Sequence, residues 1–141
     1  MIKVFLDSSV VFAAAGSQTG GSFEIINLIT KGKLEGFVNE GVVAESEEAI
    51  RRRLSQEKYN LFLNWLEKDC FKILPFPDEE KLQRLGQVSP KDRHILLSAK
   101  ESNSDFLISL DKKHILTNES QSIIPEVKIT TPKEFLQNHF K

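Results

Sequence analysis

Residues 2–9 read Ile2-Lys3-Val4-Phe5-Leu6-Asp7-Ser8-Ser9, and this stretch decides the fold. Its first five residues are rich in β-branched and aromatic side chains, which predicts a short strand over Ile2–Leu6. The strand ends at the polar triplet Asp7-Ser8-Ser9, and the apolar segment Val10–Ala15 behind it predicts a short helix. A strand that leads directly into a helix is typical of an α/β domain.

The same alternation of strand and helix patterns continues along the rest of the chain. Expected strands cover Leu34–Val38, Phe71–Leu74, Phe106–Ser109 and Val127–Thr130. Expected helices cover Phe23–Lys31, Glu40–Leu54, Gln56–Lys68, Asp78–Leu85 and Ser89–Glu101, and a last helix opens at Thr131. The sequence has no repeat and no linker, so we expect residues 1–141 to form one domain. The alternation predicts the fold class, a three-layer α/β/α sandwich with a central parallel β-sheet.

Polar residues mark where three of these helices are expected to begin. Ser22 is a candidate N-cap for the helix over Phe23–Lys31. Ser89 is followed three residues later by Asp92, which is a capping-box pattern. The C-terminal helix opens on a second capping box that begins at Thr131.

Composition and charge narrow the classes of protein that this chain can be. Apolar residues make up 40% of the chain and charged residues 28%, as in an ordinary globular protein with its own core. The net charge of −1 gives no global basic field, so an anionic partner must be held by a local patch or by bound cations. Cys70 is the only cysteine, which excludes an internal disulfide framework, and the histidines show no zinc-ligand spacing.

Targeting and membrane signals do not appear in the sequence. No apolar run approaches transmembrane length, and the N-terminus runs straight into a strand without a signal-peptide pattern. We therefore expect a cytoplasmic protein with no membrane partner. The glycines at positions 16, 20 and 21 are not followed by Lys-Ser or Lys-Thr, so they do not form a P-loop.

Three acids are expected to meet at one edge of the sheet, because ligands of open parallel sheets bind outside the carboxyl ends of the strands. Asp7 directly follows the first strand, and Asp111 closely follows the strand Phe106–Ser109. Asp92 lies in the first turn of the helix before that strand, and in a βαβ unit such a helix begins at the same edge. By helical periodicity, Asp92 also lies on the inward stripe of its helix, where an unpaired acid is costly.

Each acid also has an ordinary structural interpretation. Asp7 and Asp111 can each cap the turn that follows, and Asp92 can complete the capping box with Ser89. Glu45 lies on the flank of its helix, beside charged neighbours that are typical of a solvated face. The residues alone leave these interpretations open.

A cluster of acids at one point has a predictable chemistry. The carboxylates repel one another and their pKa values rise, and a hard cation removes that repulsion. Mg²⁺ or Mn²⁺ takes oxygen ligands, keeps several waters and commonly bridges to a phosphate. Such sites hydrolyse phosphodiesters by activating a water and stabilising the leaving oxygen. The converging acids therefore predict a site for Mg²⁺ or Mn²⁺.

Four short motifs, Phe5–Val10, Val43–Glu48, Pro90–Leu96 and Leu107–Lys112, follow one another along the chain, and residues 129–136 add a closing strand and helix. Together they resemble the PIN domain, a family of small metal-dependent nucleases that includes VapC-like toxin ribonucleases of toxin–antitoxin pairs. The resemblance implies a parallel sheet flanked by helices and cleavage of single strands, usually of RNA. It also implies that four acids are catalytic and hold Mg²⁺ or Mn²⁺: Asp7, Glu45, Asp92 and Asp111. Glu45 joins this set through the resemblance only.

Two positions depart from the family's pattern. Ser109 stands where the family often has Thr, which keeps the hydroxyl group. Some members carry a further acid after the fourth one, whereas Lys112, Lys113 and His114 follow Asp111 here. The presence of a second metal therefore stays open.

The leading hypothesis is a metal-dependent endoribonuclease that hydrolyses phosphodiester bonds of single-stranded RNA and could be the toxin of a toxin–antitoxin pair. Ser9 would support the site by orienting Asp7 or a metal-bound water, and Ser109 would support it as well. Candidate partners besides RNA are an antitoxin protein and a second copy of the chain, for which the apolar helix Gln56–Lys68 is a candidate surface.

Basic residues offer candidate contacts to RNA phosphates. Arg51, Arg52 and Lys112 are the positions that we expect to serve in this way. Solvated helix and loop surface is the commoner role of such residues, and the balanced net charge favours it.

Two other classes of function stay open. A PIN-like module could bind RNA or a protein partner without cutting, and the missing extra acid after Asp111 favours this alternative. An Asp-nucleophile phosphatase could use Asp7, but that chemistry usually needs a second acid two residues further on, where Ser9 stands instead.

Overall fold

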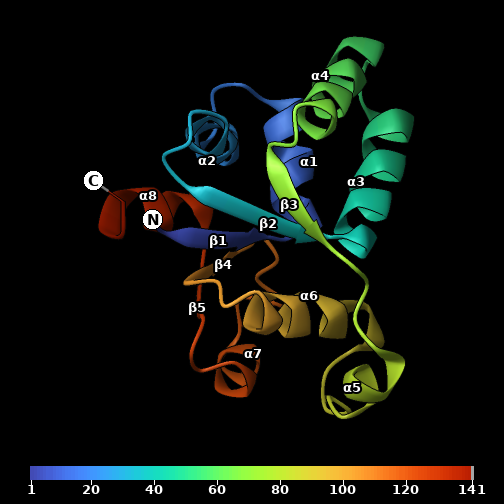
Figure 1. Cartoon of the computed structure of the whole chain (residues 1–141), viewed down its shortest axis with the longest axis vertical. Coiled ribbons are helices and arrows are strands. Elements are labelled where there is room, and N and C mark those ends of the chain that lie inside the picture. The colour runs from blue at the N-terminus through green and yellow to red at the C-terminus, as the bar shows by residue number, and fades with distance from the viewer. Residues whose placement is uncertain (141) are drawn as a thin grey trace.

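The computed structural model, which describes residues 1–140, contains a parallel sheet of five strands in the order β3-β2-β1-β4-β5 (Figure 1). The strands are β1 (Lys3–Leu6), β2 (Glu35–Asn39), β3 (Phe71–Leu74), β4 (Phe106–Ile108) and β5 (Lys128–Thr130). All four neighbouring pairs are parallel. The predicted α/β/α class is confirmed. Strand β3 has the predicted bounds, and the ends of the other four strands differ from the predicted ones by no more than one residue.

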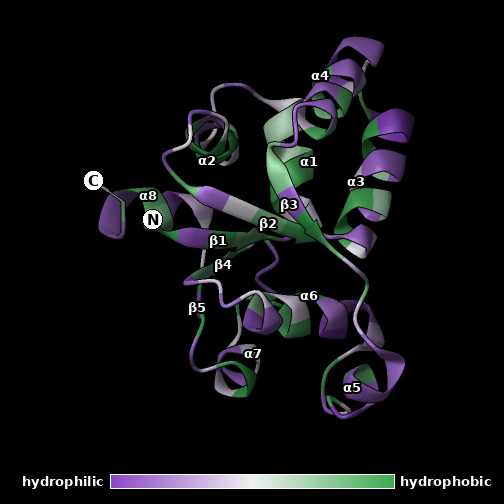
Figure 2. Cartoon of the chain, viewed as in Figure 1, coloured by the Kyte–Doolittle hydropathy of each residue, from purple (hydrophilic) through white to green (hydrophobic). Residues whose placement is uncertain are grey.

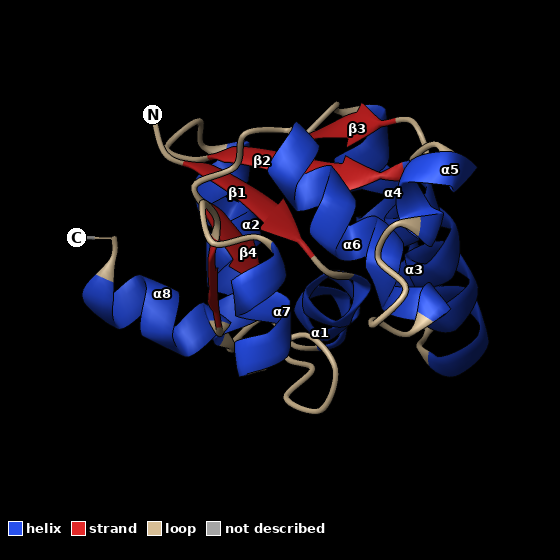
Figure 3. Ribbon diagram, turned by 90° about the horizontal axis from the view of Figure 1, so that it is seen from below, coloured by secondary structure: helices blue, strands red, loops and turns tan. Residues whose placement is uncertain are grey.

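Helices cover both faces of the sheet, as Figures 1 and 3 show. On one face lie α1 (Ser8–Gly16), α2 (Gly21–Thr30), α3 (Glu40–Arg53) and α4 (Gln56–Glu67), and on the other lie α5 (Glu79–Gln83), α6 (Pro90–Glu101) and α7 (Asn118–Ile123). The last helix, α8 (Pro132–Asn138), packs against α2. Right-handed crossovers explain the two layers, because the chain moves from β1 outward to β3 and then returns to add β4 and β5 on the other side of β1.

The core lies on both sides of the central strands. Val4, Phe5 and Leu6 of β1 and Leu107 and Ile108 of β4 are fully buried, since each of these strands is covered by helices on both faces. Figure 2 shows hydrophobic residues along most of β1 and β4, and hydrophobic and hydrophilic residues alternating along α3 and α4. Within residues 1–140, no helix is both long and apolar enough to cross a membrane.

Of the three predicted helix starts, two differ from the sequence-based expectation and one agrees with it. Ser22 is a buried residue inside α2, whose N-cap is Gly20, so the predicted cap at Ser22 is wrong. The side chain of Ser89 makes no capping hydrogen bond to α6, so that capping box does not form. Thr131 does accept a hydrogen bond from the backbone N–H of Glu134, as the second capping box predicts.

Helix α7 was not predicted, because its sequence carries almost no apolar pattern. Only Ser120 is buried among its six residues, and the helix begins with a hydrogen bond from the Ser120 backbone N–H to the Thr117 side chain.

Helix α4, proposed as a dimer surface, places Phe62 and Trp65 in the core of its own chain and leaves Leu63 38% exposed. A homodimer through α4 stays a prediction.

The order of the strands fixes where a site can form. Strands β2 and β3 lie on one side of β1, and β4 and β5 lie on the other side, so the direction of the winding reverses between β1 and β4. Ligands of open α/β sheets bind in the crevice at the carboxyl ends of such a pair. Leu6 pairs with Ile108 in the register, and the backbone N–H of Asp7 donates to the Ile108 carbonyl at 3.1 Å. Asp7 and Ser109 therefore enter this crevice side by side.

Candidate functional site

A pocket of about 520 Å³ opens at this crevice, and all four predicted acids line it. Asp7 comes from the end of β1, Glu45 from α3, Asp92 from the first turn of α6 and Asp111 from the loop after β4. Other residues of the wall include Ser8, Ser9, Phe12, Ser46, Arg53, Lys91, Leu110 and His114. The four acids thus lie around one pocket, three of them as the topology predicts and Glu45 as the family resemblance predicts.

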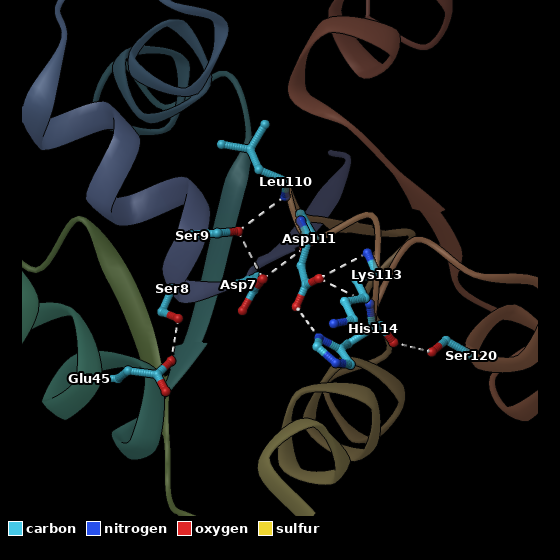
Figure 4. Close-up of polar contacts among 10 residues, drawn as sticks. Asp7, Ser8, Ser9, Glu45, Leu110, Asp111, Lys113, His114 and Ser120 are labelled. Atoms are coloured by element: carbon cyan, nitrogen blue, oxygen red, sulfur yellow. Dashed lines mark hydrogen bonds and ion pairs between the residues drawn. The ribbon is translucent and has the colours of Figure 1, made fainter. Parts of the chain in front are cut away.

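Asp7 is held at the floor of the pocket by two serine hydroxyls. It is only 7% exposed, and its Oδ2 accepts hydrogen bonds from Ser9 Oγ at 2.9 Å and from Ser109 Oγ at 2.7 Å (Figure 4). Each serine oxygen is itself fixed by a backbone N–H, that of Leu110 for Ser9 and that of Asp111 for Ser109. The Asp7 side chain makes no capping bond to α1, so the capping interpretation does not describe it.

The electrostatics of Asp7 favour a bound cation. Burial raises the pKa of its carboxyl group, and the Glu45 carboxylate adds to the rise, while the hydrogen bonds from Ser109 and Ser9 act against it. A carboxylate that is removed from water, placed near a second acid and without a basic partner in its hydrogen bonds is costly to ionise. A divalent ion in the pocket would offset that cost.

Glu45 is exposed and is held by a side chain from the neighbouring helix. The hydroxyl of Ser8, at the start of α1, donates a hydrogen bond to Glu45 Oε1. Figure 4 shows Asp7 between this contact and Asp111. The contact to Ser8 was not predicted from the sequence. The available signal was the position of Ser8 directly after Asp7, at the edge where the acids were expected to meet.

Asp92 and Asp111 form the other side of the cluster. Burial raises the pKa of Asp92, where His114 acts in the opposite direction and Asp111 adds to the rise. Asp111 Oδ1 accepts hydrogen bonds from the backbone N–H groups of Lys113 and His114, and its Oδ2 lies 3.4 Å from His114 Nδ1. Asp111 therefore does cap the following turn, as the ordinary interpretation predicts, and it also faces the pocket. His114 also lines the pocket, although it was not among the site residues predicted from the sequence.

The donor set fits a hydrated divalent ion. Four carboxylates line the pocket, and Ser46 Oγ, on its wall, is buried without a hydrogen-bond partner in the described part of the chain. Such an orphaned buried hydroxyl is a common sign of a bound water or ion. Within residues 1–140, no three His, Cys, Asp or Glu side chains are placed to hold one ion together. Mg²⁺ usually takes only one or two protein carboxylates directly and reaches others through its waters. Acids that surround one pocket without all meeting at one point fit this kind of binding.

The basic residues around the pocket differ from those selected from the sequence. Arg51 and Arg52 pair with Glu47 and Glu48 of their own helix, each at 3.2 Å, and neither lines the pocket. Lys112 is exposed and is also outside the lining. Arg53 and Lys91 line it instead. Arg53 lies eight residues after Glu45, about 80° around the axis of α3 by helical periodicity, so its spacing alone did not separate it from the two arginines before it.

A buried amide joins the two helices that carry Glu45 and Asp92. Asn39, at the end of β2, is fully buried, and its Oδ1 caps α3 by accepting from the Val42 backbone N–H at 2.8 Å. Its Nδ2 donates to Ser98 Oγ at 2.8 Å and lies 3.0 Å from His94 Nδ1, both on α6. With Nδ1 as the acceptor, the His94 ring is neutral, and burial lowers the pKa of this histidine accordingly.

Replacement of Asn39 by Ala is expected to lower the free energy of unfolding by about 2–4 kcal/mol. The change removes a helix cap and leaves buried polar groups of α3 and α6 without a partner. Urea unfolding measures the loss, and the matched control is Asn60→Ala, since Asn60 is exposed and bonds only to Gln56 on its own helix. An Asn39→Ala protein as stable as the Asn60→Ala protein would contradict this view of the network.

Comparisons with known proteins show the family and the fold. A family model described as PIN domain matches residues 3–113, so the chain belongs to the PIN domain family. A search of curated proteins finds no match.

Solved structures of low sequence identity share the fold. VapBC2 from Rickettsia felis, bound to a DNA fragment from its promoter, has a chain 16% identical with a TM-score of 0.63, and the match covers 92% of this chain and 98% of that one. PAE2754 from Pyrobaculum aerophilum gives 17% identity and a TM-score of 0.62, with 96% and 93% covered. FitAcB from Neisseria gonorrhoeae gives 17% identity and a TM-score of 0.59, with 92% and 98% covered.

Proposed function

We propose that this protein is a metal-dependent endoribonuclease that hydrolyses phosphodiester bonds of single-stranded RNA. The observation that carries the proposal is the convergence of Asp7, Glu45, Asp92 and Asp111 on one pocket at the carboxyl edge of the sheet. Membership of the PIN domain family supports it, because the acids occupy the motif positions through which the sequence resembles that family of nucleases.

The four acids would hold Mg²⁺ or Mn²⁺. When bound, such an ion supplies an activated water and neutralises charge that develops on the phosphoryl oxygens. Ser9 and Ser109 keep the Asp7 carboxylate in one orientation, since both hydroxyls donate to the same oxygen atom. The hydroxyl of Ser8 does the same for Glu45. The chain thus fixes its acids before the substrate arrives.

The rim of the pocket fits a single strand better than a duplex. Arg53 and Lys91 supply positive charge for phosphates on two sides of the acids, one from α3 and one from α6. Phe12 and Leu110 line the same pocket, and Leu110 is 44% exposed. Apolar side chains beside cations suit unpaired nucleotides, whose bases are free to contact them.

We further propose that this chain binds a partner protein and that the partner is an antitoxin. The support is the likeness in fold to VapBC2 and FitAcB, structures whose names denote paired components. In this proposal the chain is the toxin of the pair, and binding of the partner would limit access of RNA to the pocket.

The expected result for purified protein is cleavage of a labelled single-stranded RNA with Mn²⁺ or Mg²⁺ and no cleavage with EDTA. The physical reason is that the acids repel one another without a cation and cannot activate water alone. Gel separation of the products over time measures the reaction, with a duplex of the same sequence as the matched substrate. Equal cleavage in EDTA would contradict metal dependence, and faster cleavage of the duplex would contradict the single-strand preference.

A second candidate is a module that binds RNA without cutting it. One observation favours it: Lys112, Lys113 and His114 follow Asp111, at the place where some members of the family carry a further acid. This candidate predicts that the protein retains labelled RNA in a gel-shift assay and that no product forms at any concentration of Mn²⁺. The cleavage assay therefore separates the two candidates.

A further inference from the structure

Arg53, the last residue of α3, differs from the two arginines before it. Arg51 and Arg52 are paired with Glu47 and Glu48, and they lie outside the pocket. Arg53 makes no ion pair within residues 1–140, and its guanidinium carbon lies 4.9 Å from the centre of the Phe12 ring. Both Arg53 and Phe12 line the pocket. One arginine of the three is therefore held on an aromatic ring beside the acids with its charge unpaired.

The position of this pair relative to the acids follows from two contacts between α1 and α3. At the acid end, the Ser8 hydroxyl of α1 donates to Glu45 of α3. Further along, Phe12 of α1 meets Arg53 of α3. Phe12 is one helical turn beyond Ser8, about 6 Å along the axis, and Arg53 is two turns beyond Glu45, about 12 Å. The pocket therefore extends from the acids along α1 and α3 to an aromatic–cation pair.

The chemistry of the pair suits a nucleotide next to the one that is cut. A guanidinium within about 6 Å of the centre of an aromatic ring is attracted by the quadrupole of the ring. The N–H groups of the guanidinium stay free at its edge. Those N–H groups match two oxygens of a phosphate, and the planes of Phe and Arg can both stack on an unpaired base. Since the pair lies one to two helical turns beyond the contact between Ser8 and Glu45, it is placed to contact the phosphate of a neighbouring nucleotide.

We propose that Phe12 and Arg53 form a subsite that binds a flanking phosphate of a single-stranded nucleic acid, so that an oligonucleotide binds better than a dinucleotide. This proposal rests on the proposed function for its substrate class. It does not rest on catalysis, because the subsite binds the strand whether or not a bond is cut. In this proposal the arginine that contacts RNA is Arg53, whereas the sequence suggested Arg52.

The test compares Arg53→Gln with Arg52→Gln, two neutral variants one residue apart. Fluorescence anisotropy measures binding of a labelled 12-nucleotide single-stranded RNA in EDTA, where no cleavage occurs, over a range of salt concentrations. Loss of one charge-assisted contact predicts about tenfold weaker binding for Arg53→Gln, and a slope of log K against log salt that is smaller by about 0.7. Arg52→Gln is expected to stay within about twofold of the wild type.

A second readout uses substrate length. With Mn²⁺, Arg53→Gln is expected to raise KM for the 12-nucleotide RNA without lowering kcat, and to leave cleavage of a dinucleotide unchanged. Equal losses for the two variants, or an unchanged salt slope for Arg53→Gln, would overturn the subsite. Wild-type protein that cuts no RNA while Arg53→Gln alone weakens binding would overturn the nuclease and leave the subsite standing. Circular dichroism confirms that both variants are folded.

Discussion

Asp7→Asn is expected to reduce Mn²⁺-dependent cleavage of single-stranded RNA by about 10²–10³-fold or more. Asn keeps the shape of the side chain and an oxygen that can accept from the hydroxyls of Ser9 and Ser109. It removes the negative charge that would hold a divalent ion in the proposed site. Initial rates at saturating RNA measure the loss. The control is Glu48→Gln, which removes an acid outside the pocket and is expected to leave the rate unchanged.

Asp7→Asn is expected to raise the stability of the metal-free protein, although it lowers the rate of cleavage. Burial raises the pKa of Asp7, so in the metal-free protein the folded state favours the protonated acid. The contribution of Asp7 to stability is then complete below the unfolded pKa, near 4 as a rough value, and is lost as the pH rises through the raised folded pKa. Asn has no such dependence, so in EDTA the Asp7→Asn protein gains stability relative to the wild type between pH 4.5 and pH 8.

Urea unfolding in EDTA at these two pH values measures the difference, and addition of Mn²⁺ reverses it. An ion that binds the folded state at 100 times its Kd stabilises the wild type by about 2.7 kcal/mol, and it should not stabilise Asp7→Asn to that extent. If Asp7→Asn were inactive because it is unfolded, its urea midpoint in EDTA would instead be lower than that of the wild type. Cleavage by Asp7→Asn within threefold of the wild type would refute the role of Asp7.

The sequence was sufficient to predict the sheet and three of the four acids, and the reason is topological. Strands at the centre of a parallel sheet are buried on both faces, so β1 and β4 appear as short apolar runs with a polar residue at the end. Asp7 and Asp111 follow those runs, and Asp92 opens the helix that returns to the same edge. Their placement needed no knowledge of side-chain contacts.

The remaining members of the site depend on how two helices pack, which a single helix pattern does not contain. Glu45 is exposed on α3, and only the start of α1 beside it makes it part of the pocket. Arg53 is one of three successive arginines, and what separates it from the others is a contact with Phe12 on α1. A helical pattern gives the face on which a residue lies but not the element that this face meets.

Asp92 is the residue for which the capping interpretation and the metal interpretation make opposite predictions. If it mainly stabilised the start of α6, its replacement by Asn would lower stability and reduce activity only through unfolding. In the structure the Ser89 side chain forms no capping bond, and burial raises the pKa of Asp92, so its charge adds little to the helix beyond a favourable dipole interaction of about 0.3–1 kcal/mol. Activity and stability should therefore separate in this variant.

The most direct measurement is the rate of Mn²⁺-dependent cleavage of single-stranded RNA by Asp92→Asn, with thermal unfolding of the same samples in EDTA. Ser89→Ala is the matched control at the other end of the absent capping box, and it is expected to keep both its rate and its Tm. For Asp92→Asn, we expect a rate lower by about 10²-fold or more, with a loss of stability of no more than about 1 kcal/mol. A wild-type rate in Asp92→Asn, or a lower rate that only follows a lower Tm, would contradict a metal-dependent nuclease site at these acids.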